Sequence, residues 1–184
     1  LCDCTGYRLD GTDTEPSMYV GIIVNRSLAD TTDSVTGLGD VHALVNAIGE
    51  MRRVPHEAGF IAIKVDDIAE VNARFGFDAG DRVLAESAAC LMDCSRGKGR
   101  LFRSTGPTFV ALFDELGPEA IDEIASDIER FLGSPVLIGS LEYQPPIRVA
   151  TLHLDGVDRQ PVSILNELKA LLGKAVQVPG TKLD

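Results

Sequence analysis

The sequence predicts an α+β domain in which helices cover the faces of a mixed central sheet. The first observation is periodicity, because segments with apolar residues three and four apart alternate with short runs rich in β-branched residues. The second is a tight hairpin between two such runs, within residues 99–113. The third is composition, since 45% hydrophobic residues in a chain of 184 are enough to bury a core and exclude disorder as the main state. Strands interleaved with helices indicate a sheet with helices packed on it.

The first half of this domain is predicted to contain two helices and one strand. Apolar residues recur at helical spacing across 41–54, and a proline then ends the helix. The run 60–65, Phe-Ile-Ala-Ile-Lys-Val, predicts a strand. A second helix follows over 68–75, and we expect the carboxylate of Asp66 or Asp67 to cap its first turn.

The middle of the chain is predicted to form a longer helix and a hairpin. The helix spans 82–94, and a basic, glycine-rich turn at 95–99 ends it. Strands at 99–104 and 108–113 follow, and the short segment 105–107 joins them as a tight turn.

The last third is predicted to contain two helices and two strands. The helix over 118–132 is amphipathic, with a proline in its first turn and acidic residues near its start. A short strand at 135–138 and an alternating strand at 147–154 come next. The final helix spans 160–176 and gathers its leucines on one side.

The N-terminal part is predicted to be a separate hairpin. Residues 7–27 contain two strand-like runs around a polar turn, and 29–34 is a polar linker. A lone two-stranded hairpin is marginal in water, so we expect it to pack on the rest or to be the edge of a preceding domain. We therefore divide the chain into 1–32 and 33–184. Because the chain begins with Leu1 rather than Met, we interpret it as a piece of a longer protein.

Charge and hydropathy restrict the partners that we expect. Seventeen Lys and Arg against 28 Asp and Glu give a net charge of −11, without a basic cluster. Nucleic acid and anionic lipid are therefore not expected as partners, whereas a local anion site stays open. The longest apolar runs, of about five residues, are far shorter than the roughly 20 that span a bilayer. We expect no membrane segment within this piece and a cytoplasmic location.

The four cysteines, Cys2, Cys4, Cys90 and Cys94, form no CxxC pair. Cys90 and Cys94 stand four apart in a helical stretch, so they share one face of the helix. We interpret them as small apolar core residues in a reducing cytosol. The alternative is a zinc site, for which the sequence offers no His or Cys partner pair at ligand spacing.

Three stretches carry a family resemblance. Residues 33–38, Asp-Ser-Val-Thr-Gly-Leu, resemble the motif D-x-x-T-G-L, and 72–81 resembles N-D-x-x-G-H-x-x-G-D. Residues 103–110 stand where the R-Y-G-G-D/E-E-F-V signature falls and keep its frame. Over about 33–176 the chain therefore resembles the GGDEF domain of diguanylate cyclases. The resemblance implies a nucleotide-cyclase palm, a ferredoxin-like sheet of five strands wrapped by helices. Active members condense two GTP molecules, one per subunit, into cyclic di-GMP.

The catalytic positions implied by this resemblance differ here. Lys64 stands where the family has a Mg²⁺-binding aspartate, and an ammonium group has only hydrogen-bond donors. The signature hairpin reads Thr105-Gly106-Pro107-Thr108-Phe109, so its two acidic positions fall on Pro107 and Thr108. Because phosphoryl transfer of this type needs Mg²⁺ across the triphosphate, we expect neither a Mg²⁺ cofactor nor catalysis. The alternative is a displaced metal site at the aspartates 66–67.

The guanine-binding positions of the family are retained. The resemblance implies that Asn72 and Asp81 hydrogen-bond guanine, whose N1–H and N2–H suit a carboxylate. Together with Lys64 and Arg103 they form the candidate nucleotide site. The alternatives are structural: Asp81 caps a helix that starts at Arg82, Asn72 is a solvated helix residue, and Lys64 extends to water.

Phosphate and product contacts are fewer than the family has. Its two phosphate-binding lysines correspond to Ala69 and Ala175. Of the inhibitory product site R-x-x-D, Arg96 remains, while Gly99 takes the acidic position. A basic glycine turn can still hold an anion, and a solvated loop is the alternative. The N-terminal hairpin loosely resembles the last two strands of a PAS sensor domain.

These observations leave three functions. The first is a catalytically inactive regulatory domain of cyclic di-GMP signalling that binds GTP or GDP. It would tune a flanking sensor or phosphodiesterase domain of the same polypeptide. The second is a scaffold that binds no nucleotide and serves in homodimerisation or signal transmission. The third is an active diguanylate cyclase, which needs Mg²⁺ ligands that the sequence does not offer.

Overall fold

The computed structural model describes residues 2–9, 18–25, 31–51, 58–132, 135–154 and 159–183. They belong to two compact units, residues 1–30 and 31–184, which divide two positions before the predicted boundary. In the first unit, β1 (Cys2–Leu9) and β2 (Met18–Asn25) pair antiparallel along their whole length. A hairpin is thus present where one was predicted, but its first strand begins at Cys2 rather than at Tyr7. Its polar turn and the first two residues of the predicted linker, 29–30, lie outside the described residues.

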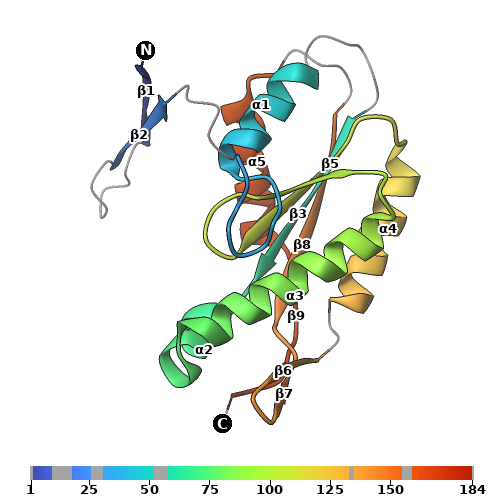
Figure 1. Ribbon diagram of the computed structural model, residues 1–184. Helices are drawn as coiled ribbons and strands as arrows, with labels where there is room; N and C mark the ends of the chain where they lie inside the picture. Colours follow the sequence, from blue (N-terminus) through green and yellow to red (C-terminus); the bar gives the residue numbers. More distant parts are fainter. Residues whose placement is uncertain are drawn as a thin grey trace. The chain divides into compact units, whose positions relative to one another are not determined.

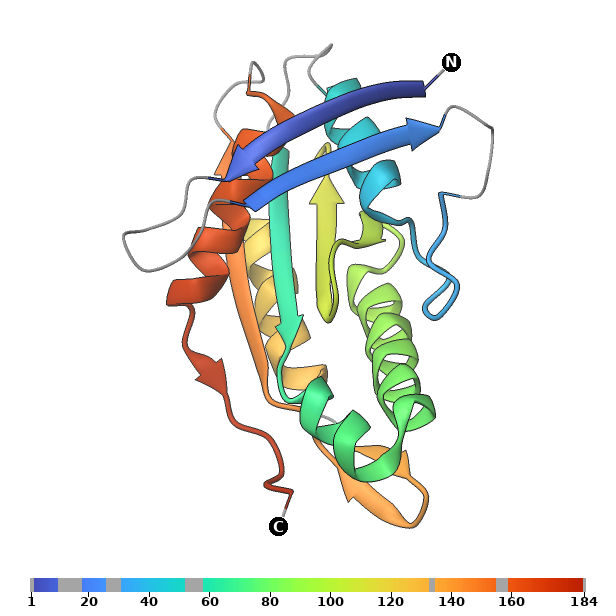
Figure 2. The same ribbon diagram turned by 90° about the vertical axis from the view of Figure 1, so that its left-hand side faces the viewer.

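The second unit is built on a five-stranded sheet with β3 at its centre (Figures 1 and 2). Its strands stand in the order β4-β5-β3-β8-β9, and every neighbouring pair is antiparallel. They are β3 (Ala58–Val65), β4 (Arg100–Arg103), β5 (Thr108–Phe113), β8 (Ile147–Leu154) and β9 (Gln177–Val178).

The predicted α+β, five-stranded fold class is confirmed, but the sheet is antiparallel rather than mixed. The physical reason is the reach of the helical connections. The connection from β3 to β4 keeps the strand direction but arrives two positions away, and the antiparallel β5 fills the place between. The connection from β5 to β8 also keeps the strand direction, and the antiparallel β3 lies between these two strands.

Helices cover both faces of the sheet (Figure 2). One face carries α2 (Ile68–Phe75), α3 (Phe77–Ser95) and α4 (Pro118–Phe131). The other carries α1 (Val41–Met51) and α5 (Pro161–Lys174). No helix in the described ranges has the length and apolar character that crossing a membrane requires.

The central strand β3 contributes side chains to both cores. Ile61 and Ile63 pack in the cluster beneath α3 and α4, whereas Phe60 and Ala62 pack in the cluster beneath α1 and α5. This alternation follows from the two-residue repeat of a strand. It explains why the segment reads as an unbroken apolar run, since both of its faces are covered.

Three elements differ from the sequence prediction. α3 begins at Phe77, five residues before the predicted start at Arg82, because Gly76 with φ of 88° alone separates it from α2. In a second small hairpin, β6 (Val136–Ile138) lies within the strand predicted at 135–138, whereas its partner β7 (Leu141–Tyr143) was not predicted. The strand β9 was not predicted either, because a strand of two residues is too short to show an alternation.

The segment 33–38 forms a turn that holds the β4–β5 hairpin. Asp33 Oδ1 accepts hydrogen bonds from the backbone N–H and the hydroxyl of Thr36, at 2.9 and 2.7 Å. The guanidinium of Arg103, at the end of β4, donates to the same oxygen at 3.0 Å. Arg103 Nε also donates to the carbonyl oxygen of Gly106 at 2.9 Å. The D-x-x-T-G-L segment therefore fixes the signature hairpin to the body of the domain.

We expect the hydrogen bonds around Asp33 to make the free energy of unfolding depend on pH. Burial acts to raise the pKa of Asp33, but hydrogen bonds from Thr36 and Arg103 outweigh it and hold the pKa below 3.8. A carboxylate of lowered pKa stabilises the fold above its unfolded pKa, and this contribution is lost as the pH falls through the folded value. Asp33→Asn should lower the free energy of unfolding near neutral pH by about 1–3 kcal/mol. In urea titrations the deficit should shrink between about pH 5 and pH 2; a deficit independent of pH would contradict the ionic role.

A second prediction concerns Gly39, which bridges to Phe102 beside the hairpin. A Cβ at this glycine would stand 2.6 Å from the Phe102 ring. We expect Gly39→Ala to cost about 1–3 kcal/mol of unfolding free energy, because the ring must move within a packed core. Gly49→Ala is the matched control, since a Cβ there meets nothing within 4 Å and alanine favours the helix. Equal chemical-denaturation midpoints for the two variants would contradict this packing argument.

Candidate functional site

The candidate site lies where β3 ends and meets the signature hairpin. Lys64 is paired with Thr108 on β5 and with Arg148 on β8. The N–H of the next residue, Val65, donates to the carbonyl oxygen of Pro107 at 3.0 Å. The structure therefore brings together Lys64, Pro107 and Thr108, the three positions at which the sequence departs from the metal-binding pattern.

Lys64 belongs to an ion cluster around a buried carboxylate. Its Nζ lies 2.6 Å from Asp66 Oδ1, and Asp66 has a side-chain exposure of 8%. Asp66 Oδ2 accepts from Arg148 Nε at 2.9 Å and from Gln177 Nε2 at 2.7 Å. Burial acts to raise the pKa of Asp66, but the hydrogen bonds from Lys64, Gln177 and Arg148 outweigh it and lower the pKa. Asp66 therefore stays ionised and organises three side chains.

Asp66 and Asp67 do not act as the carboxylate caps that the sequence predicts. Asp67 occupies the N-cap of α2 with φ of 62°, but its side chain makes no capping hydrogen bond. Its backbone carbonyl accepts from the N–H groups of Glu70 and Val71, both at 3.0 Å. The prediction is wrong because Asp66 has stronger charged partners from distant strands, which a local pattern does not reveal.

The residues at this end of β3 do not fit a Mg²⁺ ion. Lys64 has only donors, and both oxygens of Asp66 are already hydrogen-bonded to cationic or amide groups. Pro107 and Thr108 carry no carboxylate. Within the described ranges, no three His, Cys, Asp or Glu side chains gather closely enough to hold a metal ion. An anion suits the cluster better, since Lys64 is 44% exposed and two cations there face one carboxylate.

The hairpin turn uses its own backbone carbonyl groups. Gly106 adopts φ of 54°, and its carbonyl accepts from Arg103. Pro107 has no N–H to offer a phosphate. The N–H of Thr108 donates to the carbonyl of Thr105 at 3.1 Å, and Phe109 is buried in the core. The turn residues predicted to be degenerate therefore form a closed turn, in which the backbone carbonyl oxygens of residues 105–108 all accept hydrogen bonds.

The predicted guanine-binding residues come from neighbouring helices. Asn72 on α2 packs against Gly80 on α3, where an added Cβ would stand 1.9 Å from Asn72 Oδ1. Asp81 follows directly after Gly80 and is exposed. The helix cap offered as an alternative role for Asp81 is wrong, because α3 starts at Phe77 and Asp81 lies in its second turn. Asn72 is half-buried, and its buried Oδ1 has no hydrogen-bond partner among the described residues.

Two arginines predicted as site residues lie in other surroundings. Arg103 has a side-chain exposure of 16% and is engaged by Asp33 and Gly106, so it holds the hairpin. Arg96 ends α3 with φ of 50° and donates to Asp127 Oδ2 at 3.2 Å. It lies about 22 Å from Asp81 along the helix axis, given a rise of about 1.5 Å per residue.

Sequence reasoning missed Arg148 and Gln177, which complete the cluster around Asp66. Arg148 also donates to the carbonyl of Ala175 at 3.0 Å. The sequence did offer a local indication for Arg148, because it is a charged residue near the start of an otherwise largely apolar strand. Gln177 lies on the unpredicted strand β9, so nothing pointed to it.

Comparison with known proteins agrees with this geometry. The family model described as "Diguanylate cyclase, GGDEF domain" matches residues 30–150. The cyclic di-GMP phosphodiesterase PdeR of Escherichia coli is 29% identical over 119 residues, which are 64% of this chain and 18% of that protein. The diguanylate cyclase DgcS of Shewanella oneidensis is 29% identical over 84 residues, which are 44% of this chain and 28% of that protein. This chain thus spans less than a third of the length of either relative.

A solved structure shows the same fold. The diguanylate cyclase SiaD of Pseudomonas aeruginosa, determined in complex with its activator SiaC, superposes with a TM-score of 0.73 at 20% sequence identity. The superposition covers 79% of this chain and 58% of that one. Since the family model covers more than half of the sequence, this chain belongs to the GGDEF domain family of cyclic di-GMP signalling proteins.

Proposed function

We propose that this GGDEF domain is a regulatory domain that binds GTP or GDP without a divalent metal and does not form cyclic di-GMP. The observation that carries the proposal is the Lys64 ammonium, held 2.6 Å from Asp66 at the end of β3. The family resemblance places a Mg²⁺-binding carboxylate at this position. A fixed cation in its place neutralises phosphate charge without recruiting a metal.

The same substitution argues against catalysis. Phosphoryl transfer needs positive charge that bridges the phosphate oxygens and follows the charge that develops between them. An ammonium group donates hydrogen bonds but cannot coordinate two phosphates in an octahedral array. Pro107 and Thr108 add no carboxylate that would compensate. Binding without turnover is therefore the activity that these residues support best.

The base contacts support guanine as the ligand. Asp81 is an exposed carboxylate without a helix-capping role, which suits the N1–H and N2–H donors of guanine. Asn72 is placed next to it by the contact with Gly80. Positions 72 and 81 keep the residue types of the family, whereas the metal-binding positions carry other residue types.

The regulatory role extends to flanking domains. The relative PdeR is named as a phosphodiesterase, and this chain matches 18% of its length. We propose that the nucleotide state of this domain is transmitted to a flanking sensor or phosphodiesterase domain of the same polypeptide, in the cytoplasm. A homodimer of GGDEF domains would be one route for such transmission.

A scaffold without nucleotide is the second candidate, and one observation favours it. Lys64 and Arg148 already share the carboxylate of Asp66 as a partner, so neither needs a bound phosphate to hold its position. Ala69 and Ala175 also stand where the family has its phosphate-binding lysines. In this case the ion cluster only fixes the end of β3, and the domain transmits signals through its contacts.

A calorimetric titration separates these functions. GTP titrated into the chain should bind equally well with Mg²⁺ and with EDTA. Lys64→Ala should weaken binding by about tenfold, as expected for loss of one charge-assisted contact. Lys169→Ala, an exposed lysine on α5, is the control and should bind as wild type. Absence of binding would favour the scaffold, and binding only with Mg²⁺, or cyclic di-GMP formed from GTP, would contradict the proposal.

A second prediction concerns base selectivity. Asp81→Ala should remove the preference for GTP over ATP, because the carboxylate is the group that distinguishes the guanine donors. Asp78→Ala is the matched control, since it removes an exposed carboxylate one turn earlier on the same helix. Competition titrations with both nucleotides provide the measurement. Unchanged selectivity in Asp81→Ala would show that Asp81 does not read the base.

A further inference from the structure

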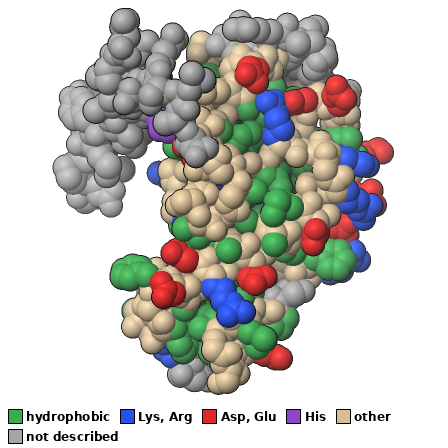
Figure 3. Space-filling view, viewed as in Figure 1, with side chains coloured by type: hydrophobic (Ala, Val, Ile, Leu, Met, Phe, Trp, Pro, Cys, Tyr) green, Lys and Arg blue, Asp and Glu red, His purple; other side chains and the backbone are tan. Residues whose placement is uncertain are grey.

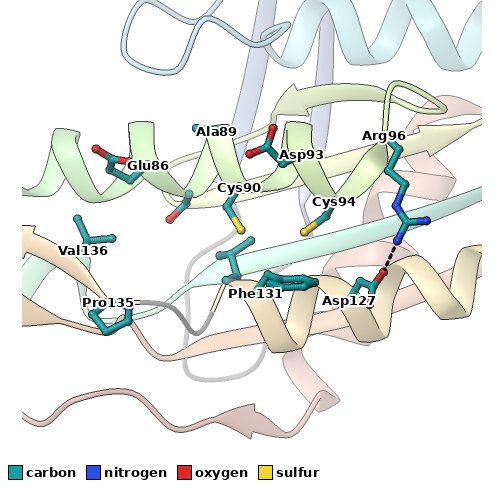
Figure 4. A pocket seen from close by; sticks show the side chains of 12 residues that line it. Glu86, Ala89, Cys90, Asp93, Cys94, Arg96, Asp127, Phe131, Pro135 and Val136 are labelled. Carbon is teal, nitrogen blue, oxygen red and sulfur yellow. Dashed lines mark hydrogen bonds and ion pairs between the residues drawn. The ribbon is translucent and has the colours of Figure 1, made fainter.

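A groove of about 570 Å³ lies between α3 and α4, apart from the end of β3 (Figure 4). Its size falls within the range of ordinary ligand pockets, which is about 300–1,000 Å³. Twelve side chains line it: Glu86, Ser87, Ala89, Cys90, Asp93, Cys94, Arg96, Asp127, Phe131, Leu132, Pro135 and Val136. None of the proposed nucleotide-binding residues is among them.

The floor of the groove is apolar. Figure 4 shows the thiols of Cys90 and Cys94 pointing from α3 into the space toward α4 and Phe131. Cys94 is buried and Cys90 half-buried, which fits their interpretation as small apolar residues. Burial, with the neighbouring Cys94, raises the pKa of Cys90 to about 12, so this thiol is neutral near pH 7. Phe131 is 47% exposed at the edge of the groove, and the guanidinium carbon of Arg130 lies 4.5 Å from the centroid of its ring.

The rim on the α3 side is acidic. Glu86 and Asp93 lie seven residues apart, hence about 10 Å apart on one side of the helix. Neither side chain has an ion-pair or hydrogen-bond partner among the described residues. Asp127, on α4, is instead paired with Arg96 at 3.2 Å and with Arg130 at 2.6 Å. The groove therefore combines an apolar floor with two uncompensated carboxylates, while charges of both signs mix over the surface seen in Figure 3.

We propose that this groove docks an amphipathic helix of a partner protein, apolar on one side and basic at two positions seven residues apart. Seven residues are two turns of a helix, so two such cations stand about 10 Å apart and match Glu86 and Asp93. The apolar side of the helix covers Cys90 and Phe131. Charge complementarity selects this occupant over an acidic or uncharged one.

The consequence concerns α3, which the docked helix would contact. The same helix carries Asp81 in its second turn, and its C-terminal end leads into β4 and the signature hairpin. Docking at the groove therefore acts on the element that joins both halves of the proposed nucleotide site. The docking proposal itself does not depend on nucleotide binding.

The test uses a fluorescein-labelled helical peptide of about 18 residues, leucine-rich on one side with two lysines seven positions apart. Fluorescence anisotropy with the full 184-residue chain should show saturable binding, weakened between about 50 and 500 mM salt. A peptide with glutamate at both lysine positions should bind at least about tenfold more weakly. Glu86→Lys combined with Asp93→Lys should reverse this preference.

Two further variants keep the test specific. Ala89→Trp places a large ring in the groove and should abolish binding of the lysine peptide. Glu115→Lys combined with Glu142→Lys makes the same change in net charge at exposed positions outside the groove and should bind as wild type. Circular dichroism of each variant confirms that it is folded.

Three results would overturn the proposal. The first is no saturation by about 1 mM peptide. The second is equal affinity for the wild type and for Glu86→Lys with Asp93→Lys. The third is a dimer of the wild-type chain in sedimentation equilibrium that the Ala89→Trp variant no longer forms. That result would assign the groove to a second copy of this chain.

Discussion

The burial of β3 on both faces determines where polar chemistry can stand in this domain. Every residue from Ala58 to Ile63 is buried, and a charge inside this stretch would lose its hydration without a partner. Lys64 is the first position of the strand that reaches solvent. The charged residues of the site therefore collect where the strand ends. The hairpin turn and β8 meet them there because both neighbours of β3 are antiparallel to it.

Once charges gather at that point, they must be balanced. Asp66 is buried and ionised, so it needs positive partners, and it finds them in Lys64 and Arg148. A bound metal would supply such charge only at sufficient concentration, whereas a lysine in the chain supplies it always. The fixed cation makes this end of β3 stable without an ion. In the proposed function the same lysine also leaves no carboxylate here to hold a metal, so one residue bears on both the stability of this strand end and the proposed lack of catalysis.

The sequence predicted elements whose signal is local, and missed features that join distant segments. The periodicity of 68–75 and the residues 105–107 were sufficient for α2 and the hairpin, which form as expected. The role of Asp66 could not be predicted, because its partners Arg148 and Gln177 lie 82 and 111 positions away. The early start of α3 was missed for a related reason. Gly80 lies in its first part, where the missing side chain makes room for Asn72 from the neighbouring helix.

That contact also bears on how the two ends of α3 can communicate. The helix has 19 residues, about 28 Å, and packs along one side into a single core. A Cβ on Gly80 would stand 1.9 Å from Asn72 Oδ1, so α2 and α3 are tightly packed at this point. A displacement of α3 by an occupant of the groove would therefore move Asn72 together with Asp81, rather than be absorbed by a loop. The close contact between Asn72 and Gly80 therefore links the proposed guanine-binding pair to the proposed docking groove.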